Sequence, residues 1–210
     1  MKTILCYGDS NTWGWNPHTA RRYPKEMRWP TILQRKLGNE FDVIAEGLPG
    51  RTTVWDDPVG GEYKNGKKYL LPCLHSHKPV DVIVIMLGTN DLKHRFSLEA
   101  VDIAQGVEML VDIVKTSCTG RDSKSPHVLV VIPPPTECID TEDSVTIGGR
   151  RKSLDFPVQF TNILNNQCHL LDAGGIVKSS SIDGEHLEPQ YHDKLANAVF
   201  AKIKEILQSF

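Results

Sequence analysis

The sequence predicts an α/β fold built on a parallel β-sheet with helices on both faces. Short apolar segments alternate along the chain with longer segments whose apolar residues recur every three or four positions. One short segment, residues 82–87, is apolar at every position, as expected of a strand buried on both faces. We therefore expect successive strands to be joined by right-handed helical crossovers.

Five strands are predicted, each from a short apolar run bounded by polar or turn-forming residues. Four helices are predicted from apolar spacing, as in the series Val101, Ala104, Val107 and Leu110. The predicted strands are residues 3–7, 41–45, 80–87, 127–132 and 168–171, and the predicted helices are residues 29–37, 98–114, 156–165 and 189–207.

Two segments do not fit this alternation. Residues 16–28 follow the first strand and are expected to form a loop. Residues 52–68 form a longer insertion, in which 62–69 is predicted to be a hairpin because Asn65-Gly66 suits a type I′ turn. Insertions of this length are commonly lids, binding loops or contact arms. Arg51 is expected to hold this loop by pairing with Asp56 or Asp57.

Length and composition indicate one domain, residues 1–210. The 210 residues are 40% hydrophobic and 24% charged, with a net charge of −2, so charge gives no reason to expect binding to nucleic acid or an anionic membrane. No apolar stretch approaches the ~20 residues of a membrane span, and the apolar N-terminal run is too short for a signal peptide. Five cysteines without a Cys-x-x-Cys motif indicate reduced thiols and a cytoplasmic location.

Polar residues follow the predicted strands, and the carboxyl ends of parallel strands share one edge of the sheet, where ligands bind. Ser10 follows the first strand and could act as a nucleophile if a base lies nearby. His186 could be that base, with Asp183 accepting the proton of its other ring nitrogen. Backbone N–H groups around Gly50 and the amide of Asn90 could stabilise an oxyanion.

Each motif has a simpler explanation when taken alone. Gly8-Asp9-Ser10 could be only a helix N-cap, Gly88-Thr89-Asn90-Asp91 only a turn, and Asp183-Gly184-Glu185-His186 only a solvated acidic turn. Their occurrence together, in this order and each after a strand, favours a catalytic site.

Together with Gly50-Arg51-Thr52 after the second strand, these motifs resemble the four sequence blocks of the SGNH hydrolases, also called the GDSL esterase/lipase family. The resemblance implies a catalytic triad of Ser10, Asp183 and His186, and an oxyanion hole formed by Ser10, Gly50 and Asn90. It also implies a flavodoxin-like three-layer sandwich with five parallel strands in the order 2-1-3-4-5, and neither a metal nor an organic cofactor. Two positions depart from the family pattern: Asn11 replaces a common leucine and Ala45 a common asparagine.

A narrower resemblance is to the bacterial arylesterase/acyltransferase branch, in the segments 8–15, 46–53 and 87–93. It implies hydrolysis of short acyl esters, acyl transfer to alcohols in some members, and a homo-oligomer in which loop 52–68 covers a neighbour's pocket. Oligosaccharide or xylan acetylesterases of this branch share the same machinery, so the expected substrate is either a simple small ester or a carbohydrate acetate. From another class, a non-catalytic ligand-binding protein on the same fold remains the alternative.

Three further residues are predicted to bind substrate. Trp13 and Trp15 lie just beyond the nucleophile, where indoles could stack on a ring, although either could simply pack in the core. Asn11 is expected to shape the acyl or alcohol pocket. Two motifs are set aside: residues 61–68 nearly match a P-loop but lack its Ser/Thr, and His75-Ser76-His77 has no evident acidic or cysteine partner for a metal.

Overall fold

A computed structural model describes residues 1–137 and 147–208 and contains the predicted α/β fold. Five parallel strands form one sheet in the order β4-β1-β5-β6-β7, so the predicted order 2-1-3-4-5 is confirmed. The strands are β1 (Lys2–Gly8), β4 (Phe41–Gly47), β5 (Val82–Met86), β6 (His127–Ile132) and β7 (His169–Asp172).

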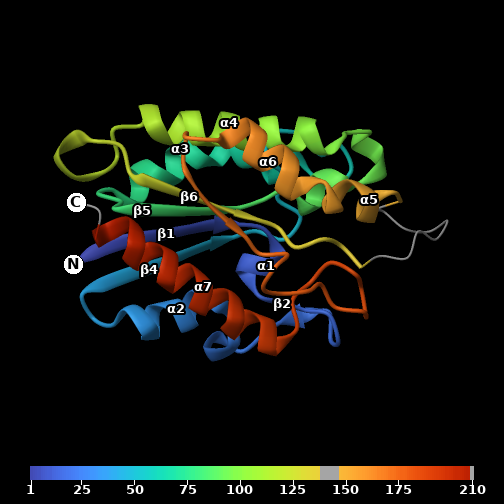
Figure 1. The fold of residues 1–210 in the computed structure, drawn as a ribbon, viewed down its shortest axis with the longest axis horizontal. Coiled ribbons are helices and arrows are strands. Elements are labelled where there is room, and N and C mark those ends of the chain that lie inside the picture. The colour runs from blue at the N-terminus through green and yellow to red at the C-terminus, as the bar shows by residue number, and fades with distance from the viewer. Residues whose placement is uncertain (138–146, 209–210) are drawn as a thin grey trace.

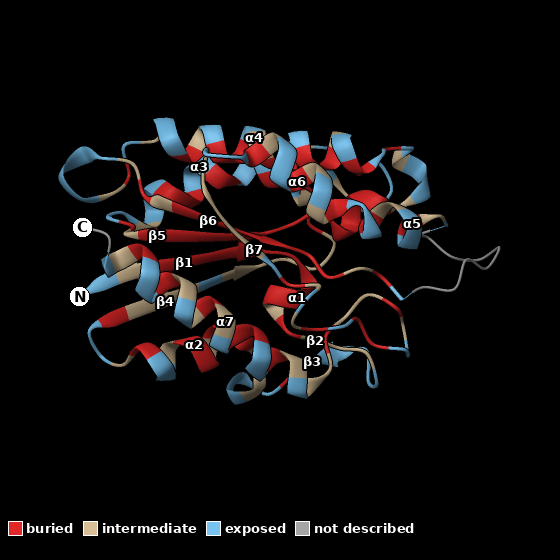
Figure 2. Cartoon of the chain, viewed as in Figure 1, coloured by how far each residue is buried: buried red, intermediate tan, exposed pale blue. Residues whose placement is uncertain are grey.

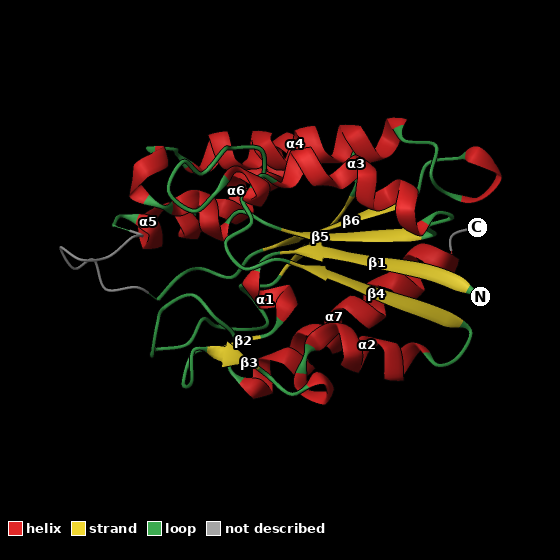
Figure 3. Cartoon of the chain, turned by 180° about the vertical axis from the view of Figure 1, so that it is seen from behind, coloured by secondary structure: helices red, strands yellow, loops and turns green. Residues whose placement is uncertain are grey.

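Helices cover both faces of the sheet (Figures 1 and 3). Helices α3 (Gly66–His77), α4 (Ala100–Thr116) and α6 (Phe156–Leu164) lie on one face, and α2 (Trp29–Leu37) and α7 (Pro189–Gln208) lie on the other. Short helices α1 (Ser10–Trp13) and α5 (Gly149–Leu154) lie beyond the carboxyl edge. Single 3-10 turns occupy Lys25–Met27, Glu62–Lys64, Thr89–Leu92, His94–Phe96 and Arg121–Ser123.

The sheet separates two apolar cores, as its uniformly apolar central strand requires (Figure 2). Along β5, Ile83 and Ile85 enter the core beneath α3, α4 and α6, whereas Val82 and Val84 enter the core beneath α2 and α7. Successive side chains of a strand point to opposite faces, so one apolar run supplies both cores. All four side chains are fully buried.

The hairpin predicted for 62–69 is wrong. Asn65 instead caps helix α3, with its side chain accepting a hydrogen bond from the N–H of Lys67 at 2.9 Å. The hydroxyl of Tyr7 donates to the carbonyl of Gly66 at 2.7 Å, which fixes the start of the helix against β1. Leu70, Cys73 and Leu74 then pack in the core, and this helix was missing from the prediction.

The segment 16–28 is only partly the expected loop. Strands β2 (Trp15–Asn16) and β3 (Arg21–Arg22) pair antiparallel as a small ribbon, followed by the 3-10 turn Lys25–Met27. Within the described residues, none of the helices combines the length and apolar character that crossing a bilayer demands.

Candidate active site

Ser10 is the first residue of α1, immediately beyond the end of β1. Asp9 caps this helix by accepting the N–H of Asn11 at 2.9 Å, and the helix ends at Gly14, whose φ of 93° is left-handed. A side chain at Gly47, where β4 ends, would collide with the backbone of Thr12 and Trp13. Glycine at that position therefore lets helix α1 pack directly on the edge of the sheet.

His186 and Asp183 form a hydrogen-bonded line with Ser10. Ring nitrogen Nε2 of His186 lies 2.8 Å from Oγ of Ser10, and Nδ1 lies 2.7 Å from Oδ2 of Asp183. The other Asp183 oxygen accepts the backbone N–H of His186 at 3.0 Å. Burial acts to raise the pKa of Asp183, but the hydrogen bonds and the charge of His186 outweigh it and lower that pKa. The carboxylate is thereby kept ionised to orient the imidazole.

Asn11 clamps the histidine loop to the nucleophile helix. Its side-chain amide donates to the carbonyl of Glu185 at 3.1 Å, and its carbonyl oxygen accepts the N–H of Leu187 at 3.0 Å. Only 3% of Asn11 is exposed. Beyond its predicted place at the substrate pocket, Asn11 thus binds the backbone on both sides of His186.

Asn90 and Gly50, the other predicted oxyanion donors, also lie beyond the carboxyl edge of the sheet. Asn90 belongs to the 3-10 turn after β5, and its side-chain nitrogen is 3.5 Å from Oδ2 of Asp9, the residue that caps the nucleophile helix. Gly50 follows β4 with a φ of 85°, which favours glycine. The structure thus brings Asn90 close to the nucleophile turn and places Gly50 on the neighbouring strand's loop.

Three carboxyl groups around the site have raised pKa values, in each case mainly because of burial: Asp9, Asp91 and Glu185. For Asp91 the pKa is raised to about 7, although hydrogen bonds from Thr53 oppose the shift. Burial favours the neutral form of each group.

Two indoles lie next to His186. The ring centroids of Trp15 and His186 are 5.4 Å apart, and those of Trp13 and Trp15 are 6.1 Å apart. The guanidinium of Arg22 lies 4.8 Å from the centroid of Trp13. Both tryptophans are only partly buried, so they flank the triad and are not core residues.

Arg51 has a role that the sequence did not reveal. Its guanidinium lies 4.1 Å from the ring centroid of Tyr7 and donates to the carbonyls of Gly8 and Glu46. The predicted pairing of Arg51 with Asp56 or Asp57 is wrong, because Asp56 binds Lys68 and Asp57 binds Lys93 and Arg95. Arg51 instead ties the Gly50-Arg51-Thr52 segment to the end of β1, next to Ser10.

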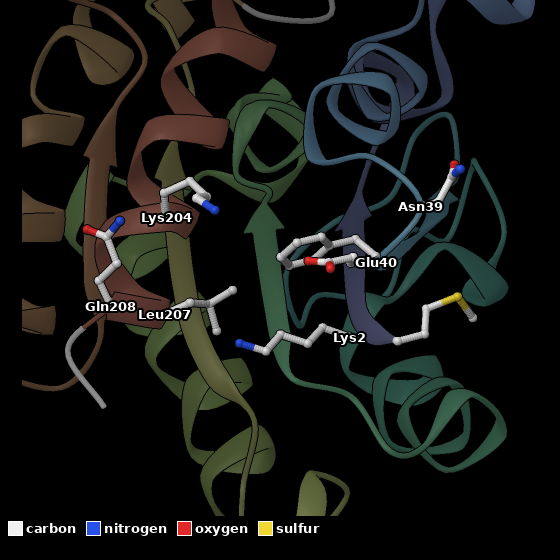
Figure 4. Close-up of a pocket in the computed structure, with 8 residues that line it drawn as sticks. Lys2, Asn39, Glu40, Lys204, Leu207 and Gln208 are labelled. Atoms are coloured by element: carbon white, nitrogen blue, oxygen red, sulfur yellow. The ribbon is translucent and has the colours of Figure 1, made fainter.

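A separate pocket lies at the opposite end of the sheet (Figure 4). It is lined by residues that include Lys2, Glu40 and Lys204. Lys2 begins β1, whereas Ser10 follows the end of that strand. This pocket is therefore distinct from the triad.

Known proteins share both the sequence pattern and the fold. The model of the GDSL-like lipase/acylhydrolase family matches residues 6–174. An aryl esterase from M. smegmatis is 36% identical with a TM-score of 0.91, covering 98% of this chain and 99% of that one. A carbohydrate acetylesterase from Sinorhizobium meliloti is 35% identical with a TM-score of 0.92, covering 98% and 100%.

A protein described as a putative arylesterase from Agrobacterium tumefaciens is 36% identical with a TM-score of 0.87, covering 98% of this chain and all of that one. The comparison with curated proteins finds no match. The family model extends over most of the chain, and these structures match it nearly end to end. The chain belongs to the GDSL-like lipase/acylhydrolase family and is a carboxylic ester hydrolase.

Proposed function

We propose that the protein hydrolyses short-chain, acetyl-type esters through an acyl-enzyme on Ser10. The observation on which this rests is the hydrogen-bonded line from Asp183 through His186 to Ser10, with distances of 2.7 and 2.8 Å. Nucleophile, base and orienting acid are the three groups that acyl transfer by a serine requires.

In the first half-reaction, Oγ of Ser10 attacks the ester carbonyl while Nε2 of His186 takes its proton. The tetrahedral oxyanion is stabilised by the Asn90 amide and by the backbone N–H groups of Ser10 and Gly50. His186 then returns the proton to the departing alcohol, which leaves the acyl group on Ser10. Water, or a second alcohol in the case of acyl transfer, repeats the sequence and releases the acyl group.

The two indoles support the preference for short acyl chains. Trp15 lies against the imidazole of His186, and Trp13 lies next to Trp15. These two bulky rings limit the space beside the reacting atoms. Flat apolar rings also stack on aromatic or sugar rings. A carbohydrate acetylesterase is therefore the second candidate, supported by these indoles and by the likeness to the Sinorhizobium meliloti enzyme.

A homo-oligomer is part of the proposal. Three large apolar side chains are exposed in the loop after Gly50: Trp55, Val59 and Tyr63. Exposed apolar groups clustered on one segment are typical of contact surfaces. Sedimentation of the intact protein, compared with a Val59→Asp, Tyr63→Asp variant, tests this: a purely monomeric wild type contradicts it.

Activity is tested with a series of p-nitrophenyl esters from acetate to decanoate. We expect acetate to be hydrolysed fastest and Ser10→Ala to lower kcat about 10⁴-fold or more, while Ser76→Ala, an exposed serine on α3, retains full activity. An Asn90→Ala variant is expected to lower kcat about 10²- to 10³-fold. A wild type inert on every ester, and on acetylated xylan oligosaccharides, would favour the ligand-binding alternative.

A further inference from the structure

Three potential metal ligands meet at the end of helix α3, away from the triad. Cys73 and His77 lie one turn apart on that helix, and Glu46 reaches them from β4. Their ligand atoms all lie within 4.8 Å of one another, and Nε2 of His77 is 2.9 Å from Oε1 of Glu46. Sequence analysis found neither partner of His77, because helix α3, which places Cys73 one turn before it, was not predicted, and Glu46 is 31 positions away.

The chemistry of the three groups matches a transition-metal site. Thiolate, imidazole and carboxylate are the ligands that zinc prefers, and three protein ligands leave the fourth tetrahedral position for water. Ligand atoms around zinc lie about 3.5 Å apart, given bond lengths of about 2.0–2.3 Å. Closing the cluster from its present spacing therefore takes movements of about 1 Å in side chains.

Access and charge also fit. The side chains of His77 and Glu46 are 27% and 23% exposed, whereas Cys73 is fully buried at the base of the cluster. An ion that enters from solvent would therefore contact His77 and Glu46 first and the sulfur of Cys73 last. A divalent cation bound to one carboxylate, one thiolate and one neutral imidazole leaves no net charge at the site. The guanidinium of nearby Arg51 binds the carbonyls of Gly8 and Glu46 and lies over the ring of Tyr7.

We propose that Glu46, Cys73 and His77 bind a zinc-type divalent metal ion. Binding converts the thiol to a metal-bound thiolate and releases its proton to solvent. Burial, and then the charge of Glu46, raise the pKa of the Cys73 thiol to about 12, so the cysteine holds its proton until a metal displaces it. The proposed ester chemistry does not use the metal in any step.

The site adjoins the nucleophile through one residue. Glu46 precedes Gly47, on which the nucleophile helix packs. The carbonyl of Glu46 also accepts a hydrogen bond from Arg51, which binds the carbonyl of Gly8 as well. A metal at Glu46 would therefore stiffen the end of β4 beside α1 and stabilise the folded chain by mass action.

Titration of the full-length protein with Co²⁺, under a thiol-free reductant, tests the proposal optically. A cobalt–thiolate bond gives a near-ultraviolet charge-transfer band, and we expect one band that saturates at one equivalent and disappears on adding Zn²⁺. Cys73→Ser is expected to abolish the band. His77→Gln and Glu46→Gln are each expected to weaken Co²⁺ binding by about tenfold or more.

Cys168→Ser and His75→Gln are the matched controls, because they remove a half-buried cysteine outside the cluster and another histidine of α3. Both should keep the band at wild-type affinity, and circular dichroism establishes that every variant is folded. No thiolate band in the wild type, or a band that survives in folded Cys73→Ser, would overturn the proposal.

Discussion

The side chain of Asn11 donates to the carbonyl oxygen of Glu185 across a sequence separation of 174 residues, at 3.1 Å. The same side chain accepts the N–H of Leu187, so it binds the backbone on either side of His186. Asn11 thus holds the loop that carries His186 against helix α1, next to Ser10. Position 11 is leucine in many members of the family. In this chain the asparagine at that position connects helix α1 to the loop of His186.

Replacing Asn11 with alanine should therefore loosen the base. The buried N–H of Leu187 loses its partner, and we expect unfolding free energy to fall by about 1–3 kcal/mol. We also expect kcat to fall, because His186 is no longer held in line with Ser10. Urea unfolding and ester kinetics measure both, with Asn39→Ala, an exposed asparagine, as control. Unchanged kcat together with lowered stability would show that the clamp is only structural.

Asp183→Asn tests the orienting acid. The amide cannot accept the Nδ1 proton in the same way, so the imidazole is left in the wrong tautomer for accepting a proton from Ser10. We expect kcat to fall roughly 10³- to 10⁴-fold with little change in KM. Asp193→Asn, an aspartate on α7, should have no effect. A loss below about tenfold would mean that another group orients His186.

Asp91 should make stability depend on pH. Its pKa is raised to about 7 in the folded protein by burial, against 3.8 for the ordinary group. Between those values the folded chain holds a proton that the unfolded chain has lost, so this contribution to stability is present below pH ~4 and is lost as pH rises toward 7. The contribution is on the order of 4 kcal/mol.

Urea unfolding across this range measures the effect as the difference between wild type and Asp91→Asn. Asparagine cannot ionise. The unfolding free energy of the Asp91→Asn variant should therefore decline less between pH 4 and 7 than that of the wild type. Parallel curves for the two proteins would show that Asp91 is ionised throughout, held by its hydrogen bonds from Thr53.

Trp15→Ala should broaden acyl-chain preference. Removing the indole beside His186 opens space next to the reacting atoms. We expect the ratio of kcat/KM for octanoate to that for acetate to rise, and KM for aromatic esters to increase as stacking is lost. Trp15→Phe keeps a flat ring and should restore most of the aromatic-ester affinity. An unchanged ratio in Trp15→Ala would mean that the acyl group lies elsewhere.

Local sequence determined the sheet and most of its helices. Strand β6 and helix α2 occupy the predicted residues 127–132 and 29–37, because their apolar spacing and boundary residues agree. The triad was also accessible from sequence, since Ser10 and the Asp183–His186 pair follow strands whose carboxyl ends share an edge. The resemblance to the family blocks then indicated the role that we propose for each residue.

Tertiary packing decided the conformation of one segment and the partners of several polar side chains, which the local sequence pattern left ambiguous. Asn65-Gly66 suits both a tight turn and a helix start, and only the contacts of Tyr7 and Thr52 with Gly66 select the helix. Arg51, Asn11 and Glu46 likewise have side chains whose partners are distant in sequence. Periodicity reports which face of an element is buried, whereas a polar side chain's partner depends on which elements the fold brings together.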